Sequence, residues 1–81
     1  MLFKKNDEAK ELKQEIKAKK AEIAEARKLH QDWIKMFMDE MNPNLAVAQM
    51  AVIDYQAKRI AQAEVNLTLL KKHYKLIKRL F

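Results

Sequence analysis

Apolar residues recur every three or four positions through the first half of the chain, and charged residues fill most of the positions between them. This spacing places the apolar side chains on one side of an α-helix. Good helix formers continue without interruption, so the pattern predicts one helix over about residues 6–41. The predicted seam, apolar at most positions, contains Ala9, Leu12, Ile16, Lys19, Ile23, Ala26, His30, Trp33 and Phe37.

The second half of the chain has the same spacing and predicts a second helix over about residues 43–80. Each helix then has about 35 residues and is roughly 50 Å long. Two long seams of this kind are typical of helices that pack as a coiled coil. The second seam contains Ala46, Gln49, Ile53, Gln56, Ile60, Ala63, Leu67, Leu70, Tyr74, Ile77 and Phe81.

A reversal of the chain is predicted at residues 42–44. Pro43 is the only proline of the 81 residues, and there is no glycine. A residue before proline is disfavoured in the helical conformation, which ends the first helix. Asn42 is also a good N-cap, with Pro43 at the favoured first position of the second helix. A short connection makes the helices antiparallel neighbours, so the predicted fold is an all-α two-helix hairpin.

Folding about this turn pairs residues whose numbers sum to about 86. Large residues then meet small ones in the middle of the seam, as facing layers require. The one polar layer pairs His30 with Gln56, and we expect it to fix the register, as a seam asparagine does in coiled coils. A pH sensor or a metal ligand is the alternative role for His30. The expected apolar pairs include Trp33 with Ile53, Ala26 with Ile60, Ile23 with Ala63, Ile16 with Leu70, Leu12 with Tyr74 and Ala9 with Ile77.

The half of the hairpin near the turn has apolar residues beside its seam as well as in it. Two helices bury only their central seam, so this surplus predicts a surface that something else covers. Methionine and aromatic residues, which adapt well to partners, are frequent in it. The candidate protein interface comprises Leu29, Trp33, Ile34, Met36, Phe37, Met38, Met41, Leu45, Val47, Met50, Val52 and Tyr55.

Two kinds of partner fit this interface. A second copy of the chain would give a homodimer built as a four-helix bundle, and an unidentified protein would give a heteromeric complex. Insertion into a membrane is opposed by Asp39, Glu40 and Asp54. Asp39 and Glu40 lack the spacing of a calcium loop, and we expect them to form a solvated helix end.

The net charge of +6 is uneven along the chain, because no acidic residue follows Glu64. The basic end is a candidate face for nucleic acid. It also fits an acidic protein, an anionic lipid surface, or favourable charges at a helix C-terminus that contact only solvent. Its residues are Lys71, Lys72, Lys75, Lys78 and Arg79.

The composition offers little chemistry for an enzyme. Without glycine there is no phosphate-binding loop or nucleophile elbow, and serine and cysteine are absent. The two histidines, His30 and His73, lie at different heights of the hairpin and cannot share a metal within one chain. We therefore expect no catalytic residue, no cofactor and no metal.

The N-terminal sequence is polar from residue 4, unlike a secretory signal, and the most apolar stretch, residues 45–57, is too short to span a bilayer. These features predict an intracellular, cytoplasmic protein with no transmembrane segment. The expected function is that of a non-enzymatic protein-interaction module, such as a small adaptor, assembly factor or inhibitor that occupies a partner's surface. A nucleic-acid-binding accessory protein is the alternative. Small phage and mobile-element proteins often have this build, an argument by analogy alone.

Overall fold

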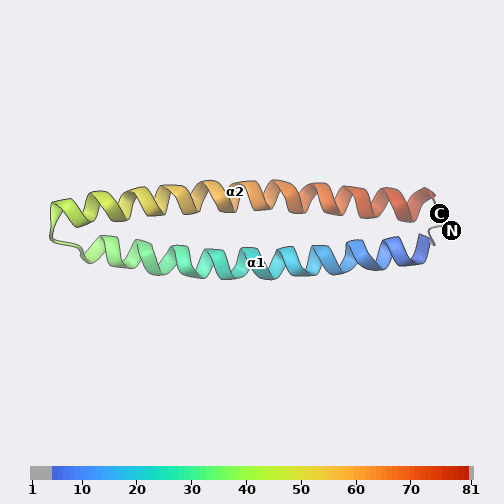
Figure 1. Ribbon diagram of the computed structural model, residues 1–81, viewed down its shortest axis with the longest axis horizontal. Helices are drawn as coiled ribbons and strands as arrows, with labels where there is room; N and C mark the ends of the chain where they lie inside the picture. Colours follow the sequence, from blue (N-terminus) through green and yellow to red (C-terminus); the bar gives the residue numbers. More distant parts are fainter. Residues whose placement is uncertain (1–4, 81) are drawn as a thin grey trace.

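The computed structural model describes residues 5–80, which form two long helices joined by a short connection. Helix α1 spans Lys5–Asp39 and helix α2 spans Pro43–Leu80. The helices run antiparallel along their whole length, with residues 40–42 at one end and the start of α1 beside the end of α2 at the other (Figure 1). The molecule measures 60 × 20 × 14 Å. The predicted all-α two-helix hairpin is confirmed.

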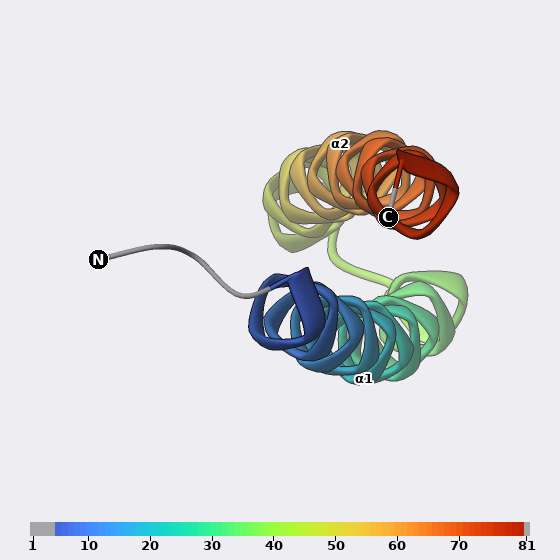
Figure 2. The ribbon, with the colours of Figure 1, turned by 90° about the vertical axis from the view of Figure 1, so that its right-hand side faces the viewer.

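The core is a single seam between the helices. Every described position of the two predicted seams is buried or half-buried, whereas most other positions are exposed. The most buried apolar side chains are Leu12, Ile23, Ile60 and Ile77. Seen end-on, the helices cross gently, which keeps one stripe of each facing the other (Figure 2). Phe81, the last predicted seam residue, lies outside the described residues.

Two helices alone leave this core thin. No large side chain among the described residues is completely buried, and twelve large apolar side chains are more than half exposed. A chain of 81 residues that buries so little gains limited hydrophobic stabilisation and commonly requires association.

The turn is closed by hydrogen bonds to both the backbone and the side chain of Asn42. Its carbonyl oxygen accepts the first helical bond of α2 from the N–H of Ala46 at 2.9 Å. Its side-chain Oδ1 accepts the N–H of Asn44, also at 2.9 Å. Asn42 is therefore the N-cap of α2 and Pro43 is its first helical residue, as the sequence indicates.

Helix α1 ends at Asp39, two residues before the predicted end at Met41, so the connection is residues 40–42 rather than 42–44. The N–H of Glu40 donates to the carbonyl of Phe37 at 3.1 Å, which tightens the last turn. The carboxylate of Glu40 accepts the N–H of Asn42 at 3.2 Å and the side-chain amide of Gln49 at 3.0 Å. Glu40 is thus half-buried and bonded across the turn, and the expectation of a solvated side chain was wrong for it.

Neither helix, within residues 5–80, has a stretch that is both long and apolar enough to cross a bilayer.

Candidate interaction surface

The structure leaves most of the predicted protein interface open. Four of its twelve residues, Trp33, Ile34, Phe37 and Val52, are half-buried beside or within the seam. The other eight are exposed, most of all Met41 in the connection, which is 92% exposed. These eight are Leu29, Met36, Met38, Met41, Leu45, Val47, Met50 and Tyr55.

These side chains do not form one continuous cluster, because they lie on different sides of the hairpin. In α1, Leu29 and Ile34 are five residues apart, which turns them about 140° away from each other. Leu29 and Val52 lie together on one face of the hairpin. Ile34 and Met50 are not among the residues that line this face, and steps of seven residues place them on the other face, with the ion pair of Arg27 and Glu64. The sequence identifies the apolar residues, and the packing of the two helices determines on which face of the hairpin each of them lies.

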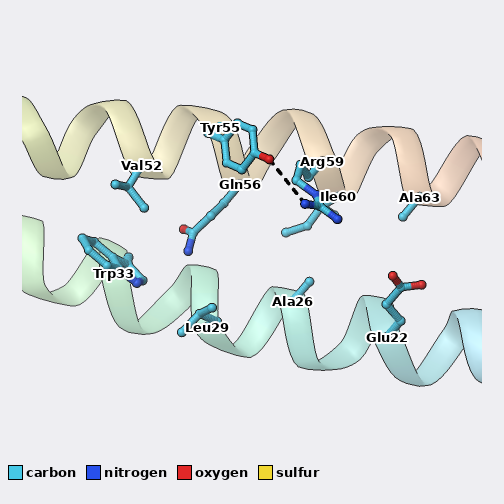
Figure 3. Close-up of a pocket in the computed structure, with 10 residues that line it drawn as sticks. All are labelled: Glu22, Ala26, Leu29, Trp33, Val52, Tyr55, Gln56, Arg59, Ile60 and Ala63. Carbon is cyan, nitrogen blue, oxygen red and sulfur yellow. Dashed lines mark hydrogen bonds between the residues drawn. The ribbon is translucent and has the colours of Figure 1, made fainter.

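A groove of about 450 Å³ lies on the face that carries Leu29. Figure 3 shows Trp33 pointing from α1 toward Val52 on α2, with Gln56 reaching down between the helices. The lining is apolar over most of its length, a common property of sites that bind helices or other apolar partners. The lining residues are Glu22, Ala26, Leu29, Trp33, Val52, Tyr55, Gln56, Arg59, Ile60 and Ala63.

Polar groups lie at the edge of this groove. The guanidinium of Arg59 donates to the hydroxyl of Tyr55 at 3.3 Å and lies 5.8 Å from the centre of its ring (Figure 3). This hydrogen bond is the largest cause that raises the pKa of Arg59, the Glu22 carboxylate acts in the same direction, and desolvation acts in the opposite one. Arg59 therefore remains a cation at the rim, opposite the acidic side chain of Glu22.

The sequence interpretation did not include Glu22 and Arg59 in the interface. A signal for both was present, because Glu22 lies seven residues before Leu29 and Arg59 lies seven residues after Val52. A seven-residue step returns nearly to the same side of a helix. Following that step along each helix, without regard to polarity, would have found them.

The predicted polar layer forms part of the seam behind the groove. His30 Nδ1 lies 3.0 Å from Gln56 Oε1, a pair whose numbers sum to 86. Both residues are half-buried. An ion pair between Arg27 and Glu64 joins the helices on the face opposite the groove. Both contacts hold the helices in register.

The basic residues at the end of α2 are all exposed. At 100° per residue they fall within about 120° of arc, so they share one face. The ammonium of Lys78 lies 5.4 Å from the ring centre of Tyr74, a cation–π contact on this face. The residues are Lys71, Lys72, Lys75, Lys78 and Arg79.

Within the described part of the chain, no group of three His, Asp or Glu side chains is arranged to hold a metal ion. Comparison with known proteins found no matching family model, curated protein or solved structure.

Proposed function

We propose that this protein is a non-enzymatic protein-interaction module, an adaptor, assembly factor or inhibitor that works by occupying a protein surface. The observation that carries the proposal is the exposure of eight large apolar side chains in the half near the turn, beside an apolar groove. Continuous apolar surface is rarely left open on a protein unless it binds something, and the groove lined by Leu29, Val52 and Tyr55 provides such a surface on one face. Its methionines suit this role, because their flexible side chains adapt to a partner.

Self-association is the simplest way to cover this surface. Two hairpins packed face to face form a four-helix bundle, in which the thin seam of each becomes part of a larger core. The same surface would be available to a foreign protein if the chain remained a monomer. A reducing intracellular compartment suits a chain without cysteine.

Sedimentation over a dilution series through the micromolar range tests the proposal. The wild-type chain should associate, and the double variant Leu29→Glu/Met50→Glu, which places a charge on each face near the turn, should not. Thr68→Glu is the matched control, because Thr68 is also exposed but lies in the other half of the hairpin and lines neither the groove nor the smaller hollow. A wild-type monomer that melts cooperatively would contradict self-association.

For a monomeric chain, the remaining test is affinity capture from the native cell with the same three proteins. Capture that is lost in Leu29→Glu/Met50→Glu and kept in Thr68→Glu would support a foreign partner at this surface. Capture that is unaffected by either substitution would contradict the proposed interface.

A second candidate function is nucleic-acid binding by the end of α2. It is favoured by the five basic side chains that share one exposed face, with no acid after Glu64 in that helix. Binding of this kind depends on the release of counterions, so its affinity falls steeply with salt. Titrations with duplex and single-stranded DNA and RNA across a salt series test it, and the absence of salt-dependent binding would exclude it.

A further inference from the structure

Charge is strongly segregated along the groove side of α1. Starting from the groove residues Glu22 and Leu29, steps of three and four residues trace the α1 groove edge from residue 8 to residue 39. This edge holds every acidic residue of α1 except Asp7, and none of its lysines or arginines. Its acidic residues are Glu8, Glu11, Glu15, Glu22, Glu25, Asp32 and Asp39.

The corresponding edge of α2 has the opposite character. The same steps from the groove residues Val52 and Arg59 trace an α2 groove edge that has no acidic residue and is mainly apolar. A second, smaller hollow lies on this side, lined in part by Leu69 and His73. The edge consists of Leu45, Ala48, Val52, Tyr55, Arg59, Gln62, Asn66, Leu69, His73, Leu76 and Leu80.

Lysine and arginine side chains flank this apolar edge on its outer side. Lys58, Lys72 and Arg79 are separated by multiples of seven residues, so they form a line next to it. All three are exposed. Lys58 contacts Asp54 in its own helix at 3.1 Å, and an exposed pair of this kind is weak and easily exchanged. Helix α2 is therefore an apolar stripe with a cationic border, which is complementary to the acidic edge of α1.

Building on the proposed self-association, we infer that the groove face binds the groove face of a second copy, turn beside turn. The two-fold axis then runs along the length of the bundle. Each α1 lies against α2 of the other copy, and the apolar surfaces around Trp33 and Tyr55 of both copies meet at the same height. Such an interface is isologous, the commonest kind in soluble homo-oligomers.

Charge complementarity is the first argument for this occupant. In the turn-beside-turn arrangement, residues of the two copies are level when their numbers sum to about 86, as they are within one hairpin. Every cation in the border then meets an acid on the α1 groove edge. The residues that lie at about the same height in the two copies are Lys58 with Glu25 and Asp32, Lys72 with Glu11 and Glu15, and Arg79 with Glu8.

The second argument is the exclusion of the alternative geometry. Only one other two-fold arrangement brings the two grooves face to face, and it places the turn of one copy over the open end of the other. In that arrangement α1 lies on α1, so the two acidic edges oppose each other. Opposed like charges at an interface are unfavourable and act against the wrong register. The segregation of acids on α1 therefore selects the arrangement with the turns together.

Distances between spin labels on the associated protein test the arrangement. The chain has no cysteine, so Asn44→Cys places one label at the turn of each copy. If the two turns lie beside each other, the two labels should be roughly 20–30 Å apart, which is the width of a four-helix bundle plus the length of the label side chains. If the turn of one copy lies over the open end of the other, the two labels should be about 50 Å apart, which is the length of the helices at a rise of 1.5 Å per residue.

A mixed sample supplies the reciprocal measurement. With one copy labelled at Asn44→Cys and the other at Lys10→Cys, near the open end, our arrangement predicts about 50 Å and the alternative predicts roughly 20–30 Å. A dimer that gives the alternative pair of distances overturns the inference and leaves self-association standing. A protein that does not associate overturns both.

Charge reversal provides an independent check on the same dimer. Glu15→Lys should weaken association about twofold to fivefold, because it removes the attraction to Lys72 of the other copy. Adding Lys72→Glu to that variant should restore it. If acidic edges faced each other instead, Glu15→Lys alone would strengthen association, and that result would refute the arrangement.

Discussion

Replacing Ile60 with alanine should destabilise the hairpin by about 2 kcal/mol. Ile60 is 9% exposed, lines the groove and faces Ala26 of α1 (Figure 3). The substitution removes three carbons from a nearly buried site, which costs about 2.4 kcal/mol at ~0.8 kcal/mol per carbon. Alanine favours the helix by roughly 0.4 kcal/mol relative to isoleucine, which lowers the net loss to about 2 kcal/mol.

Urea unfolding followed by far-UV circular dichroism measures this loss, with all proteins at one chain concentration because association shifts the apparent stability. Val65→Ala is the matched control in the same helix. Val65 is 53% exposed, so its truncation should change the free energy of unfolding by less than about 0.5 kcal/mol. Equal losses for the two variants would show that the seam is not where the structure places it.

Three further predictions concern the turn, the polar layer and the register. Asn42→Ala should lower the free energy of unfolding by about 1 kcal/mol through loss of the N-cap, whereas Asn42→Asp should retain it; equal melting curves for the two variants would contradict the capping. A double-mutant cycle with His30→Leu and Gln56→Leu should show a coupling of about 1 kcal/mol, and additive losses would mean that the pair makes no interaction. Cysteines at positions 26 and 60 should form a disulfide within one chain under mild oxidation, and more efficient cross-linking of pairs shifted by one heptad would refute the register.

Two local features of the sequence determine the hairpin. The three- and four-residue spacing fixes which side of each helix is buried, and the Asn42–Pro43 pair fixes where the chain reverses. These two signals agree on the pairing of His30 with Gln56, which lie within hydrogen-bonding distance in the structure. The end of α1 was harder to predict from the sequence, because it depends on the Glu40 side chain, which bonds Asn42 and Gln49 only after the turn has formed.

The surface was harder to predict than the seam. Leu29 and Ile34 are both apolar and both flank the seam, and the spacing alone does not show that they lie on opposite faces. The groove separates them, because its lining includes Leu29 and Val52 but neither Ile34 nor Met50. The line of acidic residues along α1 can be found in the sequence once the groove side of the helix is known. Its role depends on which surface packs against the groove.

Sedimentation of the wild-type chain in the micromolar range, beside Leu29→Glu/Met50→Glu, tests the central claim most directly. The claim is that the open apolar surface near the turn is an interface and that a second copy covers it. It predicts a species of twice the 9.6 kDa chain mass for the wild type and a monomer for the variant. A wild-type chain that stays monomeric and unfolds cooperatively, with stability equal to that of the variant, would contradict it.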